Sequence, residues 1–394
     1  MSEASTVIQK HKIRNLLVFI AILLLVIIPK GGFKIAGIPI TWGYLYLGFL
    51  GTGCIFLLSP TYPFNKRAIA CYLATLPFLF YFIIHISVIG FDSSIGNLIA
   101  FFVSYMFMPL LFLVLLAGPL GRVDKHYLEN LICKAVVVVS VYGLVLFVYK
   151  QVLGYYIEIP YITINAADAG TLENKYNQRG DIFKLISTYN NGNIFGVCIL
   201  FLFPVFYRRH KNIFQLCVVL LALLLTLSRT VWIGVIIFFL IEYRSRLVKL
   251  VKVYLFIGVL LFLLGSFVFT QYFQYGSMEN FLLDTSFGGR LRQIREAFQP
   301  TLFGIEPFEN IDEVVYLSIY RQFGIIGFLL FLISFLAPIF IYADAAKDKD
   351  KAYFIALIIY CVLCMSDGCT LLIPTLAIYN FVICMAFTKY SPQQ

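Results

Sequence analysis

Long, uninterrupted apolar runs follow one another along the whole chain. They lie near residues 15–29, 35–58, 68–90, 94–118, 128–149, 191–206, 212–228, 230–242, 251–270, 314–341, 352–366 and 369–388. Most of them approach the roughly 20 residues that a helix needs to cross a bilayer. The runs are continuous and do not alternate, which favours helices over the strands of a barrel. The pattern predicts an all-α, polytopic integral membrane protein with about 12 transmembrane helices, forming a single membrane domain over residues 1–394.

The composition supports a lipid environment. Hydrophobic residues make up 61% of the 394 and charged residues 13%, whereas a soluble domain carries about 25% charged residues. A soluble domain could not cover so much apolar surface, but lipid can. The net charge of +10 is therefore not read as a nucleic-acid signal, because the positions of the basic residues matter more than their sum.

Those positions predict an orientation. Clusters of Lys and Arg fall in alternate loops, all on one side when the spans are counted. They are Lys10, Lys12 and Arg14; Lys66 and Arg67; Arg122 and Lys125; Arg208, Arg209 and Lys211; Arg244, Arg246 and Lys249; and Lys347, Lys349 and Lys351. Because cytoplasmic loops carry the excess of basic residues, both termini are expected in the cytoplasm, and the protein is expected as a multi-pass component of the bacterial inner (cytoplasmic) membrane. Lys30 and Lys34 are exceptions on the other side.

Two long segments, 150–190 and 271–313, lie on the opposite, periplasmic side in this scheme. Connections of this length are uncommon unless they are functional. The second contains the stretch GGRLRQIREAFQP, which reads as a short amphipathic helix. Its arginines, Arg290, Arg292 and Arg295, offer planar forks suited to phosphate or carboxylate. An interfacial helix that is merely solvated explains the stretch equally well.

Further polar residues lie at the outer ends of the spans. Arg229 stands between two apolar runs, where an arginine is costly unless it is functional or reaches the interface. By helical spacing, Glu313, Tyr316, Tyr320 and Arg321 share one face of the next span, which predicts either a polar pocket or a structural ion pair.

The segment TYNNGNIFG opens another span with three asparagines, Asn190, Asn191 and Asn193. Asparagine is a common helix cap, and its amide could also bind sugar hydroxyls. Both interpretations remain open at this point.

Several classes of protein are excluded by absent motifs. The chain has no phosphate-binding loop and no dinucleotide fingerprint, which argues against an ATP-driven pump or a sugar-nucleotide enzyme. Its four histidines are scattered, and most of its nine cysteines lie inside apolar runs, so neither a metal site nor a disulfide framework is expected. We therefore expect no cofactor, no metal and no nucleic-acid partner.

The order of four segments resembles bacterial O-antigen polymerases (Wzy-type) and the related O-antigen ligases. These segments are TYNNGNIFG, LTLSRTVWIG, GGRLRQI followed by PTLFGIEP, and IDEVVYLSIYRQFGIIG, within residues 189–330. The resemblance implies a GT-C-like membrane glycosyltransferase of lipopolysaccharide biosynthesis that is metal-independent and faces the periplasm. Its implied substrate is an undecaprenyl-pyrophosphate-linked oligosaccharide, and its implied partners are membrane lipids and a possible chain-length regulator protein.

The family's motifs map onto particular residues. Its Ser-Arg motif falls on Ser228 and Arg229, and its periplasmic Gly-Arg falls on Gly289 and Arg290. The His-Asn-x-Tyr-Leu pattern of the ligases aligns with residues 313–317, where Glu313 replaces the histidine. That replacement favours a polymerase over a ligase, which would transfer the glycan to lipid A-core.

The expected roles follow from the chemistry of glycosyl transfer, which needs stabilisation of the leaving phosphate and a base for the acceptor hydroxyl. The expected catalytic residues are Glu313, Asp312 and Arg290; the expected substrate-binding residues are Arg229, Arg292, Arg321, Tyr316, Tyr320, Asn191, Asn193 and Arg179. A polysaccharide flippase is the alternative from the transport class. It is disfavoured by the two long outer loops and by the lack of an internal repeat.

Overall fold

The computed structural model describes residues 3–35, 38–59, 62–174, 178–179, 182–209, 212–244, 301–344 and 351–388. The predicted span at 251–270, the predicted amphipathic helix and most of the second long loop lie outside the described residues.

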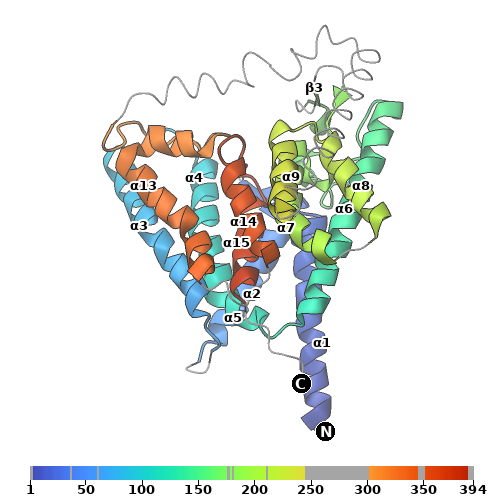
Figure 1. Ribbon diagram of the computed structural model, residues 1–394. Coiled ribbons are helices and arrows are strands. Elements are labelled where there is room, and N and C mark those ends of the chain that lie inside the picture. Colours follow the sequence, from blue (N-terminus) through green and yellow to red (C-terminus); the bar gives the residue numbers. More distant parts are fainter. Residues whose placement is uncertain are drawn as a thin grey trace.

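The described chain is mostly helical, and its long helices run between two ends of the molecule, with both termini at the same end (Figure 1). The helices are α1 (Glu3–Ile22) continued by the π-helical η1 (Leu23–Ile27), α2 (Trp42–Phe56), α3 (Lys66–Val88), α4 (Ile95–Phe102) continued through η2 (Val103–Phe107), η3 (Leu110–Leu116) and α5 (Ala117–Leu120), α6 (Lys125–Leu153), α7 (Gly192–Arg209), α8 (Ile213–Leu225), α9 (Arg229–Glu242), α13 (Val315–Asp344), α14 (Lys351–Leu363) and α15 (Thr375–Phe387). Two small antiparallel hairpins accompany them, β1 (Gly32–Ile35) with β2 (Ile38–Thr41) and β3 (Gln178–Arg179) with β4 (Ile182–Phe183). We call the end with the termini the terminal end and the opposite end the outer end.

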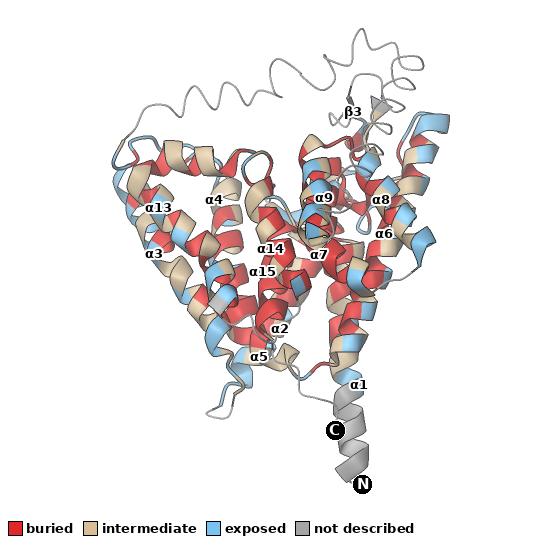
Figure 2. Cartoon of the chain, viewed as in Figure 1, coloured by how far each residue is buried: buried red, intermediate tan, exposed pale blue. Residues whose placement is uncertain are grey.

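Five helices among the described residues are long and apolar enough to cross a membrane. They are Lys66–Val88, Ile95–Leu120, Lys125–Leu153, Gly192–Arg209 and Val315–Ala343. Large apolar side chains such as Phe49 and Phe56 are 76% and 84% exposed, and exposed residues line the outward faces of several helices (Figure 2). Such exposure is unfavourable in water but not in lipid. The chain is therefore a helical membrane protein.

A buried carboxylate joins several helices at the terminal end. Glu129 of α6 is fully buried and pairs with Arg209 of α7. It also lies 3.7 Å from the Lys125 ammonium and accepts a hydrogen bond of 3.1 Å from the Tyr353 hydroxyl of α14. Because a buried charge is tolerated only when it is paired, this network fixes how α6, α7 and α14 pack.

The predicted continuous span 314–341 is interrupted in the structure. Gly324 has a φ of +67°, which breaks α13 into two sections. The freed backbone groups are satisfied by an inserted segment, because Ile325 donates to the Thr301 carbonyl at 3.0 Å and Ile326 to the Leu302 carbonyl at 3.2 Å. The first section lies across the outer end and the second descends through the molecule (Figure 1).

The first long loop folds against neighbouring elements. The Lys34 ammonium of β1 lies 2.6 Å from the Asp168 carboxylate, and the Trp42 indole donates to the Tyr161 carbonyl at 2.7 Å. At the end of α6, Lys150 pairs with Glu173. The ion pair to Asp168 gives a physical reason for a basic residue on the lysine-poor side.

Candidate functional site

Chain segments that are far apart in the sequence meet at the outer end of α7, α9 and α14. The Asn193 amide donates to the Asp367 carboxylate at 2.5 Å. The hydroxyls of Thr230 and Ser366 lie 2.9 Å apart, and the Gly368 amide donates to the Glu313 carbonyl at 3.1 Å. The turn between α14 and α15 therefore holds together three of the segments that the sequence analysis singled out. We call Asn193, Thr230, Glu313, Ser366 and Asp367 the outer polar cluster.

Asp367 lies at the centre of this cluster and is only 2% exposed. One of its carboxylate oxygens accepts from Asn193, and the other accepts from the Cys369 thiol at 3.0 Å. Asp367 was not among the predicted site residues, although it stands between the apolar runs 352–366 and 369–388. An acidic residue between two apolar runs was the available signal, since ionisable groups at membrane depth are commonly functional.

Glu313 is the exposed carboxylate of the cluster. The pKa of the nearby Cys369 thiol is raised well above its ordinary value, chiefly by burial and next by Asp367, and the Glu313 carboxylate also contributes. The hydrogen bond from the Gly368 amide to the Glu313 carbonyl holds Glu313 beside the same turn. The cluster thus contains a buried, hydrogen-bonded carboxylate, Asp367, and an exposed one, Glu313.

The predicted common face of Glu313, Tyr316, Tyr320 and Arg321 is wrong for Glu313. Helix α13 begins at Val315, whose amide donates to the Cys364 carbonyl at 3.1 Å, so Glu313 precedes the helix. The Tyr316 hydroxyl donates to the Cys361 carbonyl at 2.8 Å, and the Tyr320 ring packs edge-on against another ring of α13. Tyr316 therefore packs against α14, and Tyr320 packs within α13.

Arg321 lies among carboxylates. Its guanidinium is 3.4 Å from Glu309, 3.6 Å from Glu306 and 3.8 Å from Asp312, and its side chain is 16% exposed. The structure thus brings together two predicted site residues, Arg321 and Asp312. The surrounding negative charge favours the structural ion pair over a phosphate-binding role for Arg321.

Asn191 acts as a helix cap. Its side-chain oxygen accepts from the amides of Asn193 at 2.8 Å and Ile194 at 3.3 Å, at the start of α7. The cap orients the first turn, from which the Asn193 side chain reaches Asp367. Capping is therefore the interpretation that the structure favours for Asn191, while Asn193 belongs to the polar cluster.

Four predicted site residues remain, and the structure describes the side chain of Arg229 alone among them. Arg229 is the first residue of α9, half-buried and adjacent to Thr230 of the cluster. Arg179 lies in β3, with its side chain outside the description, and Arg290 and Arg292 lie outside the described residues.

The outer polar cluster combines the exposed carboxylate of Glu313 with the buried carboxylate of Asp367 and its amide partner Asn193, and Arg229 stands next to the cluster at the start of α9. Within the described ranges, no group of three or more His, Cys, Asp or Glu residues could hold a metal ion. Among known proteins, no family model, no curated protein and no solved structure matches this chain.

Proposed function

We propose that the chain is a polymerase of O-antigen or a similar surface polysaccharide in the bacterial inner membrane. It transfers a growing glycan from undecaprenyl pyrophosphate onto a new lipid-linked repeat unit in the periplasmic leaflet. One observation carries the proposal: the segments TYNNGN, LSRT and IDEVV, which resemble the polymerase family in order, meet through contacts with the turn 364–370.

In the proposed reaction, the acceptor hydroxyl attacks the anomeric carbon of the donor sugar. The bond from that carbon to the pyrophosphate oxygen breaks, and undecaprenyl pyrophosphate leaves. Glu313 takes the proton of the acceptor hydroxyl, and the guanidinium groups of Arg229 and Arg290 stabilise the negative charge on the leaving group. The energy comes from the donor's own bond, so the proposal includes no nucleotide, metal or cofactor.

The two candidate bases, Asp312 and Glu313, differ in their surroundings. Asp312 lies 3.8 Å from Arg321, and this ion pair engages its carboxylate. Glu313 is exposed beside the hydrogen-bonded pair of Asn193 and the buried Asp367. We therefore assign the base to Glu313 and give Asp367 a positioning role, in which it fixes the Asn193 amide.

The proposed setting is a GT-C-like bundle of about twelve helices with both termini in the cytoplasm. Two observations support it. The basic ends of α7 and α14 lie at the terminal end, beside the buried carboxylate of Glu129. The outer polar cluster lies at the opposite end, where the first long loop also lies (Figure 1).

The test uses a strain that lacks the chromosomal gene and expresses plasmid-borne variants at matched protein levels. The glycan is resolved as a ladder of repeat units on a gel. Glu313→Gln keeps the shape of the side chain but removes its basic oxygen, so the ladder should collapse to single-repeat product. Glu309→Gln is the matched control, because Glu309 is an exposed carboxylate of the same segment, and it should leave the ladder long.

Each outcome bears on a different part of the proposal. A normal ladder in the deletion strain itself would refute the polymerase, and a loss of even single-repeat product would indicate a ligase or a flippase. If Asp312→Asn shortens the ladder while Glu313→Gln does not, the base is Asp312. If neither variant shortens it, acceptor activation does not come from this segment.

A further inference from the structure

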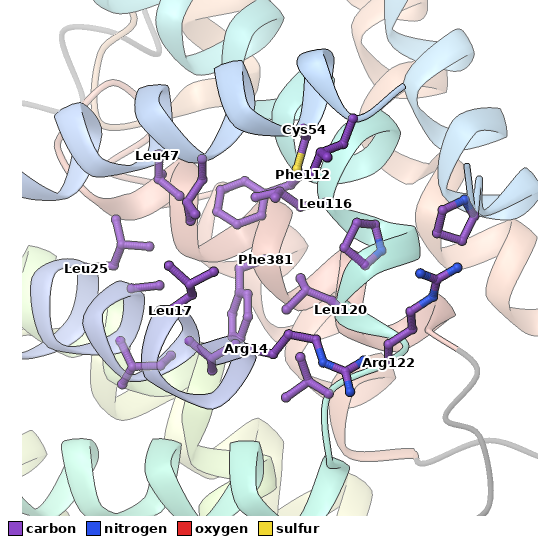
Figure 3. A pocket seen from close by; sticks show the side chains of 18 of the residues that line it. Arg14, Leu17, Leu25, Leu47, Cys54, Phe112, Leu116, Leu120, Arg122 and Phe381 are labelled. Carbon is purple, nitrogen blue, oxygen red and sulfur yellow. The ribbon is translucent and has the colours of Figure 1, made fainter. Parts of the chain in front are cut away.

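A large apolar cavity lies in the terminal half of the molecule, away from the outer polar cluster. It has a volume of about 660 Å³ and lies between α1, α2, the helical run that ends in α5, and α15 (Figure 3). Its walls include Leu17, Leu25, Leu47, Phe112, Leu116 and Phe381. This volume falls within the roughly 300–1,000 Å³ of ordinary ligand pockets, and the walls suit a hydrocarbon chain.

Two arginines lie at one end of this cavity. Arg14 comes from α1 and Arg122 from the connection after α5, and Figure 3 shows both side chains at the same end of the cavity. Neither forms an ion pair with a described residue. The Nε atom of Arg14 is buried and has no hydrogen-bond partner within the part of the chain that the structure describes. The cavity therefore ends in positive charge that no described residue neutralises.

The depth of the cavity matches one leaflet of a bilayer. Arg14 and Val26 both line it, and at 1.5 Å per residue of helix, slightly less in the π-helical part, they are roughly 17 Å apart along α1. Half of a hydrocarbon core of about 30 Å is about 15 Å. An acyl chain with its headgroup at the interface spans such a distance, whereas a long polyprenyl chain exceeds it.

We propose that this cavity binds one anionic phospholipid from the leaflet at the terminal end. One acyl chain fills the apolar space between α1, α2 and α15, and the phosphate accepts hydrogen bonds from Arg14 and Arg122. A guanidinium matches a phosphate by paired, charge-assisted hydrogen bonds. The site is separate from the outer polar cluster and does not depend on the proposed glycosyl transfer.

The test is native mass spectrometry of the full-length protein in detergent, titrated with phosphatidylglycerol or with phosphatidylcholine of the same acyl chains. The wild-type protein should retain phosphatidylglycerol preferentially. The double variant Arg14→Gln/Arg122→Gln should bind it at least tenfold more weakly, since one basic residue near an anionic headgroup changes affinity about fivefold. The control Lys66→Gln/Arg67→Gln removes two exposed charges at the start of α3 and should leave the affinity unchanged.

A second variant separates lipid binding from folding. Ala21 lines the cavity, so Ala21→Phe should occupy the space of the acyl chain and weaken phosphatidylglycerol binding while both arginines remain. Each variant is first shown to be monodisperse by gel filtration. Equal retention of the two lipids by the wild type, or unchanged affinity in the double variant, would overturn the proposal. Displacement of phosphatidylglycerol by an equal concentration of undecaprenyl phosphate would overturn its assignment to a phospholipid.

Discussion

The hydrogen bond between Asn193 and Asp367 allows a quantitative test of the outer polar cluster. It joins two residues 174 positions apart in the sequence, one at the start of α7 and the other in the turn after α14. The informative changes are Asn193→Ala, Asn193→Asp, Asp367→Asn and the swapped pair Asn193→Asp/Asp367→Asn.

The magnitude follows from burial. Asp367 is only 2% exposed, and Asn193 is partly exposed. The Asn193 amide nitrogen lies 2.5 Å from the Asp367 carboxylate oxygen. A hydrogen bond to a charged group contributes about 1.5–3 kcal/mol, and a buried acceptor that loses its donor retains the cost of desolvation. Asn193→Ala should therefore destabilise the protein by about 2 kcal/mol, which for a chain of 394 residues corresponds to a fall in Tm of roughly 2–3 °C.

Asn193→Asp should behave differently, because it places two carboxylates in contact. Two such groups cannot both ionise, so the pair keeps a proton at a raised pKa. A carboxyl whose pKa is higher in the folded than in the unfolded state binds more protons when folded, so stability rises as the pH falls. The Tm of Asn193→Asp relative to the wild type should therefore increase from pH 8 to pH 5. The swapped pair restores one amide and one carboxylate and should regain most of the lost stability at pH 8.

The assay is thermal unfolding in one detergent, followed by tryptophan fluorescence, with Asn97→Ala in α4 as a control outside the cluster. The scan rate is held fixed, because membrane proteins commonly unfold irreversibly. The reasoning is refuted if Asn193→Ala leaves the Tm unchanged. It is equally refuted if the destabilisations of the two single variants simply add in the swapped pair, since residues in contact must show coupling.

Three further predictions address the fold. Gly324→Ala should abolish folded protein on gel filtration, because φ is +67° and an added Cβ would lie 2.6 Å from the Phe303 carbonyl carbon; Gly53→Ala, which meets no atom within 4 Å, should be tolerated. Glu129→Gln should destabilise by about 3 kcal/mol in thermal unfolding, because its fully buried carboxylate holds two cations; Glu242→Gln, which loses a partly exposed ion pair, should cost less than about 1 kcal/mol. A variant retaining only Cys369 should resist maleimide up to pH 9 until it is denatured, since burial raises the pKa of that thiol; labelling of the folded protein at pH 8 would contradict this.

The first turn of α7 has one contact that the local sequence predicts and one that it does not. The three asparagines of TYNNGNIFG marked a helix start, and Asn191 does cap α7. The partner of Asn193 was not predictable, because Asp367 lies in another loop and no local periodicity connects the two. The same limit applies to Glu313, which precedes α13 because the Val315 amide bonds to the distant Cys364 carbonyl.

The sequence by itself determined that the chain is a helical membrane protein, and where most of its described helices run. Lipid offers no hydrogen bonds, so every apolar run must satisfy its own backbone, and hydropathy records that local requirement. The tertiary structure decided where α13 breaks, which carboxylates surround Arg321 and which segments meet at Asp367. Each of these depends on a contact between residues far apart in the chain, such as the Thr301 carbonyl that accepts the Ile325 amide beside Gly324. Contacts of this kind form only when the helices pack, and they leave no period in the sequence.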